Sequence, residues 1–161
     1  MKKLLLLLSF SPILISSGHV EPIKDPKPPL IQHVKPQPKI IPHNPIHNLI
    51  NALIYVESRG KTDAIGDTHL GSPSIGVLQI RPIMVREANR ILKKLPNSKP
   101  FKLGDRFSRK KSISMFMVWK NYHHKNDSFE KIARCWNGGP KGYKNNSTLK
   151  YWVKVKKQLN K

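Results

Sequence analysis

Carboxylates are few from residue 44 onward, and one of them occupies a position suited to chemistry. The seven that occur there are Glu57, Asp63, Asp67, Glu87, Asp105, Asp127 and Glu130. Glu57 follows Leu53 by four residues and Ile54 by three, so it extends the apolar stripe of a predicted helix and should point inward. A carboxyl among apolar neighbours loses hydration, which raises its pKa towards the range of a general acid. The alternative is a glutamate at a helix end that simply reaches water.

Other catalytic arrangements find less support in the residue pattern. The only adjacent histidine pair, His123-His124, has no Glu at metalloprotease spacing, so we expect no zinc site. Cys135 is the only cysteine, which excludes a disulfide within the chain. No nucleophile motif surrounds Cys135, so we expect it to be a small buried residue. The sequence therefore predicts neither a metal nor a cofactor.

The elements that must position Glu57 are predicted to be helices, in a mainly α domain spanning residues 44–161. Asn44 is a plausible N-cap and Pro45 a favourable first helical residue, while Gly60 ends this first helix. Four further helices are expected, one from Pro82 to Leu95, one capped by Ser108, one opened by a capping box of Asp127 and Glu130, and one from about Ser147. The only segment with alternating character, Ile75–Ile80, predicts a short strand.

Each of these four helices has apolar residues at helical spacing, and these should face the core. The residues expected to be buried are Val85, Ala88, Ile91, Leu92, Leu95, Ile113, Phe116, Met117, Phe129, Ile132, Ala133, Trp152, Val155 and Leu159. No internal repeat is present. One helical domain with a single modest core is therefore expected.

Two segments of different composition precede this domain. Residues 1–18 start with two lysines, continue through an apolar run and end in small residues, which is the layout of a signal peptide. The apolar run is short for a membrane-spanning helix. Residues 19–43 form a Pro- and Lys-rich segment, and eight of the fourteen prolines lie between Glu21 and Pro45. We interpret it as an extended linker, with a proline-rich docking ligand as the alternative.

Four short motifs occur in order over about 100 residues of the domain. They are Tyr55–Gly60 (YVESRG), Ser74–Ile80 (SIGVLQI), Ala133–Pro140 (ARCWNGGP) and Tyr151–Val155 (YWVKV). This set resembles the lytic transglycosylases (SLT type) of the goose-type lysozyme superfamily. In that family the motifs read Glu-Ser at a helix end, a Gly-Leu-Met-Gln-like turn, Ala-Tyr-Asn-Ala-Gly and Tyr-Val-x-x-Val.

The resemblance implies a single lysozyme-like domain that cleaves peptidoglycan glycan strands, with Glu57 as the only catalytic acid and base. It also implies that Gln79 and Asn137 line the sugar groove and that Tyr151 forms a hydrogen bond near Glu57. The full set of predicted substrate-binding residues is Ser58, Gly76, Gln79, Trp136, Asn137, Gly138 and Tyr151. Glycines let the backbone approach a sugar closely, although ordinary turn chemistry also explains Gly138, and Ser58 could instead satisfy the helix end.

The sequence departs from the family pattern at three places. Trp136 stands where a Tyr is usual, Gly138 replaces an Ala, and Val77-Leu78 replaces Leu-Met. Trp136 either stacks on a sugar ring or fills the core. Tyr151 has a similar alternative, as a core aromatic with its hydroxyl at the edge.

The resemblance further implies the outcome of the reaction. The bond between N-acetylmuramic acid and N-acetylglucosamine would be cleaved with help from the substrate's acetamido group, giving a 1,6-anhydro product without a cofactor. A hydrolytic lysozyme, with water positioned by Asp63 or Asp67, is the close alternative. A non-catalytic basic wall-binding protein is the alternative from a different class.

The formal net charge of +21 predicts an attraction to polyanions. Charge alone does not separate nucleic acid from the anionic polymers of a bacterial wall. The signal peptide favours export to the periplasm or to the cell wall outside the cell. We therefore expect peptidoglycan and anionic wall polymers as partners, no nucleic acid, and no stable membrane insertion once the signal is removed.

Overall fold

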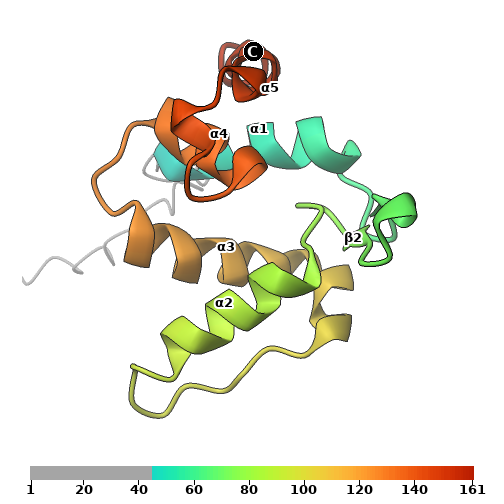
Figure 1. The fold of residues 1–161 in the computed structure, drawn as a ribbon, viewed down its shortest axis with the longest axis vertical. Coiled ribbons are helices and arrows are strands. Elements are labelled where there is room, and N and C mark those ends of the chain that lie inside the picture. The colour runs from blue at the N-terminus through green and yellow to red at the C-terminus, as the bar shows by residue number, and fades with distance from the viewer. Residues whose placement is uncertain (1–44) are drawn as a thin grey trace, which may run out of the picture. The chain divides into compact units, whose positions relative to one another are not determined.

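The computed structural model describes residues 45–161, and this part of the chain is mainly helical, as predicted (Figure 1). The elements are α1 (Pro45–Ser58), β1 (Ile65–Gly66), η1 (Thr68–Leu70), β2 (Ser74–Ile75), α2 (Pro82–Leu92), η2 (Leu103–Phe107), α3 (Arg109–His123), α4 (Phe129–Gly138), η3 (Gly142–Lys144), η4 (Asn146–Thr148) and α5 (Leu149–Leu159), where η denotes a 3-10 helix. The predicted signal peptide (1–18), the linker (19–43) and the N-cap Asn44 lie outside the described residues. Within residues 45–161, no helix is both long and apolar enough to cross a membrane.

Helix α1 lies at the centre of the helix packing. It contacts α5, which also contacts α4, while α2 and α3 pack against each other (Figure 1). A small antiparallel pair, β1 with β2, follows α1 and aligns Ile65 with Ile75.

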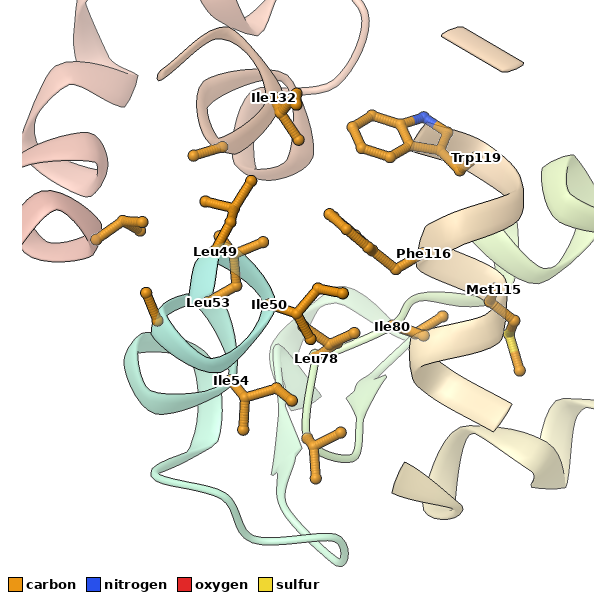
Figure 2. Close-up of a cluster of buried hydrophobic side chains, with 14 of the residues drawn as sticks. Leu49, Ile50, Leu53, Ile54, Leu78, Ile80, Met115, Phe116, Trp119 and Ile132 are labelled. Carbon is orange, nitrogen blue, oxygen red and sulfur yellow. The ribbon is translucent and has the colours of Figure 1, made fainter. Parts of the chain in front are cut away.

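The apolar stripe predicted for α1 forms the middle of the hydrophobic core (Figure 2). Leu49 and Leu53 are fully buried, and Ile50 and Ile54 nearly so. Side chains from the other elements complete the core, namely Leu78, Ile80, Met115, Phe116, Trp119 and Ile132. Burying a side chain of this size contributes about 1.5–3 kcal/mol. The stripe therefore sets the rotation of α1, and with it the direction of residue 57.

Helix α2 is shorter than the sequence predicted. It ends at Leu92, and the chain continues in a tight turn in which Lys94 and Leu95 donate backbone hydrogen bonds to Ile91 and Leu92. Pro96 disfavours helical geometry at the residue before it. Leu95 consequently leaves the inner face and is 53% exposed, so the prediction that it is buried was wrong.

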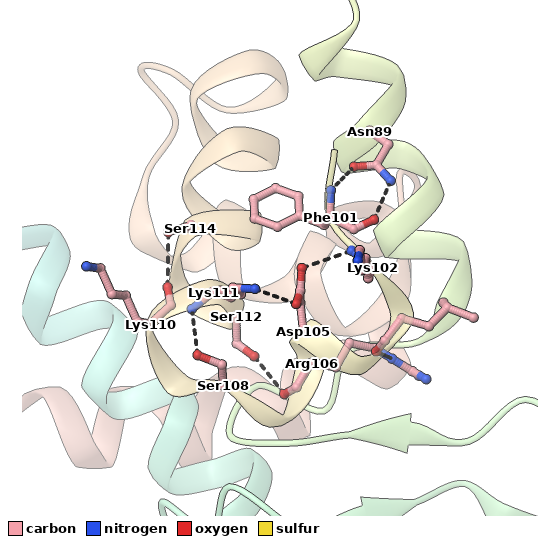
Figure 3. A network of polar contacts seen from close by, with 11 residues as sticks. Asn89, Phe101, Lys102, Asp105, Arg106, Ser108, Lys110, Lys111, Ser112 and Ser114 are labelled. Atoms are coloured by element: carbon pink, nitrogen blue, oxygen red, sulfur yellow. Dashed lines mark hydrogen bonds and ion pairs between the residues drawn. The ribbon is translucent and has the colours of Figure 1, made fainter. Parts of the chain in front are cut away.

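A polar network closes the loop after α2 and leads the chain into α3 (Figure 3). The Asn89 side chain donates to the carbonyl of Phe101 and accepts from its N–H, at 2.9 and 2.8 Å. Asp105 accepts from the backbone N–H of Lys102 and from the ammonium of Lys111. Ser108 caps α3 as predicted, and Phe116 of that helix is fully buried.

The start of α4 differs from the predicted capping box. Ser128, not Asp127, is the N-cap and accepts a hydrogen bond from the N–H of Lys131. Asp127 is held by His124 Nδ1 at 2.7 Å and by the ammonium of Lys131 at 2.9 Å. The carboxylate of Asp127 is therefore bound by these two side chains, so the prediction of a box formed by Asp127 was wrong. Cys135 on α4 is buried, as predicted.

The predicted strand Ile75–Ile80 is confirmed only at Ile75, which belongs to β2, because residues 76–79 form a turn. Ile75 and Ile80 exchange backbone hydrogen bonds of 3.1 and 2.9 Å, so the chain reverses between them. Gly76 and Gln79 both have positive φ, of 79° and 47°, which breaks the extended conformation. Alternation of residue types had indicated a strand, but a buried turn also places Val77 and Leu78 in the core.

The last helix begins slightly later than expected. The 3-10 turn η4 precedes it, capped by Asn145, which accepts from the N–H of Ser147 at 3.0 Å. Val155 of α5 is fully buried, while Trp152 and Leu159 pack at the edge of the core. This packing holds α5 against α1.

Candidate active site

The carboxyl of Glu57 meets α5 at the last turn of α1. The hydroxyl of Tyr151 donates a hydrogen bond of 2.6 Å to Glu57 Oε1. Burial raises the pKa of Glu57 from 4.5 to about 7, the hydrogen bond from Tyr151 partly opposes this rise, and the charge of Asp67 adds to it. A carboxyl with such a pKa is roughly half protonated at neutral pH. The inward position of Glu57 and its contact with Tyr151 are therefore confirmed.

Glu57 opens onto a cleft of about 570 Å³. The cleft is lined by residues from α1, the β-hairpin region, the start of α2 and the end of α4, namely Glu57, Asp67, Ser74, Gln79, Ile80, Arg81, Ile83, Met84, Trp136, Asn137, Gly138 and Gly139. A cavity of this size is typical of sites for small organic ligands or single units of a polymer. Four of the predicted substrate-binding residues, Gln79, Trp136, Asn137 and Gly138, are in this lining.

The structure distinguishes between the two nearby aspartates that the sequence left equivalent. Asp67 lines the cleft with Glu57, whereas Asp63 does not. Asp67 has a left-handed backbone with φ of 53°, at the start of η1, which is costly for a residue other than glycine and tolerated best by Asn and Asp. The cleft thus contains two carboxylates, and their charges interact.

The wall formed by the end of α4 combines an aromatic side chain with an exposed amide. Trp136 packs edge-on against Phe116 and Trp119, with ring centroids 5.1 Å apart in both pairs, and still reaches the cleft. Asn137 is exposed. A Cβ at Gly138 would lie 2.6 Å from Thr148 Cγ2, so this glycine allows α4 to approach η4. Trp136 therefore belongs to both the core and the cleft.

Gln79 lines the cleft, but its amide is occupied by neighbouring groups. Its Oε1 accepts from Ser74 Oγ at 2.8 Å, and its Nε2 donates to the carbonyls of Ala64 and Gly76 at 3.2 and 3.0 Å. These bonds tie the turn to β2 and to the residue that precedes β1. In this conformation Gln79 supports the wall of the cleft through its hydrogen bonds.

Three of the predicted substrate-binding residues, Ser58, Gly76 and Tyr151, lie outside the cleft lining. The buried hydroxyl of Ser58 donates to the carbonyl of Val77 at 2.9 Å, which links the end of α1 to the turn. Gly76 is buried as well, and a Cβ there would overlap the carbonyl oxygen of Arg106. Both residues hold the turn in place, which is the role that turn chemistry and helix-end hydrogen bonding predict. Tyr151 touches Glu57 without itself lining the cleft.

Sequence reasoning missed several residues of the cleft, chiefly at the start of α2. Arg81, Ile83 and Met84 line it, and Arg81 brings a positive charge to the cleft that holds the two carboxylates. The signal for this was available, since Pro82 opens a helix only three residues after Gln79. Because the motif Ser74–Ile80 ends just before α2, the residues that follow it form the next wall of the cleft.

A second depression of about 590 Å³ adjoins the cleft. The two share Ile83, Met84, Trp136 and Gly139, and Trp119, His123 and His124 extend the second one along α3. Its walls are largely apolar and aromatic. The two hollows together provide a binding surface longer than one sugar ring.

The described part of the chain contains no set of side chains suited to bind a metal ion. Among residues 45–161, no group of three or more His, Cys, Asp or Glu side chains is arranged to hold a metal ion.

Neither the protein-family models nor the curated proteins compared with this sequence give a match. The residues of the cleft themselves indicate its chemistry, above all the carboxyl of Glu57, which can release and regain a proton near neutral pH.

Proposed function

We propose that this protein is an exported lytic transglycosylase with a lysozyme-like fold, which cleaves peptidoglycan between N-acetylmuramic acid and N-acetylglucosamine. The observation that carries the proposal is Glu57, a desolvated carboxyl with a pKa of about 7 that opens onto the cleft. The four ordered sequence motifs support it, since parts of all four lie around this carboxyl. Export and the place of action in the wall rest on the sequence alone.

The first step requires a proton at the glycosidic oxygen. The protonated carboxyl of Glu57 donates it, the bond between that oxygen and the anomeric carbon breaks, and the N-acetylglucosamine part leaves with its hydroxyl restored. Positive charge develops at the anomeric carbon. The carbonyl oxygen of the neighbouring acetamido group of the substrate stabilises this charge, so a carboxylate nucleophile is not needed.

The second step returns the proton to the enzyme. The 6-hydroxyl of the muramic acid attacks the anomeric carbon, the 1,6-anhydro ring closes, and the ionised Glu57 accepts the hydroxyl proton. A pKa of about 7 suits both steps, because the group gives and takes a proton at similar cost. Tyr151, whose hydroxyl donates to Glu57, orients the carboxyl in both states.

The remaining residues of the cleft would bind the glycan strand. Asn137 has an exposed amide that can both donate to and accept from an acetamido group. Trp136 lines both hollows and could contact neighbouring sugars of one strand. Peptidoglycan glycan strands match this long, partly apolar surface.

A hydrolytic lysozyme is the second candidate, and the position of Asp67 favours it over a simple binding protein. Asp67 lines the same cleft as the general acid, where a carboxylate could position an attacking water. In that case Asp67→Asn should abolish the product. In the transglycosylase the same substitution should only change the pH dependence.

The products of intact peptidoglycan distinguish these functions. The protein is incubated with purified walls, and the soluble muropeptides are weighed by mass spectrometry. The transglycosylase should release products about 18 mass units lighter than hydrolysed muropeptides, since no water is added. Products with a free reducing end, lost in Asp67→Asn, would instead establish the hydrolase. A wall-binding protein would sediment with the walls and release nothing.

A further inference from the structure

Most basic residues take no part in the candidate active site, and α5 concentrates several of them. Lys150, Lys154 and Lys157 follow one another at spacings of four and three residues, which places them along one face of the helix about 5 Å apart. All three side chains are exposed. The sequence of α5 contains no Asp or Glu, so this face presents a line of positive charge.

A groove of about 300 Å³ lies beside this face, between α5 and α1. It is lined by Tyr55, Val56, Arg59, Lys154, Lys157 and Gln158. Tyr55 is two residues from Glu57 on α1, which corresponds to about 200° around the helix axis, and Arg59 follows the last residue of that helix. The groove thus opens away from the cleft, and the two have no lining residue in common.

The cations of the groove lack acidic partners. Among residues 45–161, none of the ion pairs involves Arg59, Lys154 or Lys157. By contrast, Lys111 and Lys131 are each paired with an aspartate. Gathering like charges beside a concave surface raises the local positive potential, and an anion bound there would relieve the repulsion.

We propose that this groove and the lysine line of α5 form a binding site for the phosphate groups of a linear polyanion of the poly(glycerol phosphate) kind. The regular spacing of the lysines suits a chain with phosphates at repeated intervals, rather than one isolated anion. The choice of a wall polymer as the source of the phosphates rests on the proposed function, whereas the anion site rests on the groove and its charges. Occupancy of the site would hold the protein on the wall and leave the cleft open.

The aromatic residue of the groove argues against nucleic acid as the polyanion. Proteins that bind single strands stack bases on free aromatic faces. Tyr55 is the one aromatic residue that lines the groove, and Arg59 and Lys161 already lie over its ring, at 4.6 and 5.5 Å. A groove of 300 Å³ also admits a single thin chain and not a duplex.

The test measures binding of short poly(glycerol phosphate) to the full chain over a range of salt concentrations. Lys154→Gln with Lys157→Gln should weaken binding about tenfold at low salt. It should also reduce the slope of log affinity against log salt by about 1.4, that is, by about 0.7 for each phosphate that a lysine no longer neutralises. The matched control, Lys93→Gln with Lys110→Gln, removes two exposed lysines outside the groove and should change both quantities much less.

Each outcome decides the proposal. Equal weakening in the two double variants would show a diffuse basic surface and overturn the site. Tighter binding of oligothymidylate, or binding of phosphatidylglycerol vesicles without binding of the polymer, would overturn the choice of ligand. The Glu57→Gln protein should bind the polymer like wild type. The Lys154 and Lys157 variant should release muropeptides normally from phosphate-free peptidoglycan, which separates a failure of this site from a failure of the proposed enzyme.

Discussion

Replacing Glu57 by Gln should make the protein more stable above neutral pH while removing its activity. The amide is nearly isosteric and can still accept the hydrogen bond from Tyr151. The amide cannot ionise, whereas the carboxyl of Glu57 has to ionise at a position where it is partly removed from water. The release of muropeptides should fall by at least about 100-fold, the usual scale of general acid catalysis.

The gain in stability follows from the pKa of Glu57. That pKa is raised by burial from 4.5 to about 7 in the folded protein, so the stability contributed by the neutral form is complete below pH 4.5. Between pH 4.5 and 7 the carboxyl of Glu57 loses its proton in the unfolded chain and keeps it in the folded protein. The free energy of unfolding of the wild type should therefore fall by about 1.4 kcal/mol per pH unit relative to the variant, and by about 3 kcal/mol in total.

Urea unfolding followed by tryptophan fluorescence at pH 4, 6 and 8 measures this difference. The two proteins should be about equally stable at pH 4, and at pH 8 the variant should have a urea midpoint higher by about 2 M, for an m-value of about 1.5 kcal/mol/M. Glu87→Gln is the matched control with the opposite sign. The pKa of Glu87 is lowered to about 2, first by the hydrogen bond from Arg90, so that variant should be the less stable one at pH 8. A difference between Glu57→Gln and wild type that stays constant from pH 4 to 8 would refute the desolvation of Glu57.

Four other changes test the site and its support. Tyr151→Phe removes a hydrogen bond that lowers the pKa of Glu57, so the loss of kcat/KM at alkaline pH should move up by about one pH unit. Asp67→Asn removes a charge that raises the pKa of Glu57, so the loss of kcat/KM at alkaline pH should move to lower pH. A shift to higher pH, as in Tyr151→Phe, would contradict the electrostatic account. Gly76→Ala forces a Cβ against a backbone carbonyl at positive φ and should lower stability by more than about 2 kcal/mol in urea unfolding, whereas an unchanged midpoint would show that the turn can relax. Deleting residues 21–42 should change Tm by only about 1 °C, and a larger loss would mean that this segment packs on the domain.

The helices and the direction of Glu57 could be predicted because both depend on local periodicity. Apolar residues three and four positions apart have to share a face of α1 wherever that helix packs. Burial of Leu53 and Ile54 therefore determined where Glu57 would point. The single cysteine and the positive charge were equally evident in the sequence, since they need no geometry.

Local patterns failed where two interactions compete over short distances. Asp127 matched a capping box, but its carboxylate is held by His124 and Lys131 instead. Alternation over Ile75–Ile80 indicated a strand, although the positive φ of Gly76 and Gln79 reverses the chain there. The spacing of residue types reveals neither the partners of Asp127 nor the turn at Gly76 and Gln79.

The composition of the site itself was decided by the tertiary structure. Tyr151 lies 94 residues from Glu57 and reaches it only because α5 packs on α1. Asp63 and Asp67 were equivalent in the sequence, and the hairpin region brings only Asp67 to the cleft. The raised pKa of Glu57 has a local cause, because the apolar stripe of α1 turns the carboxyl inward. Its magnitude depends on residues from distant parts of the chain that the fold brings close, because desolvation and charge act through space.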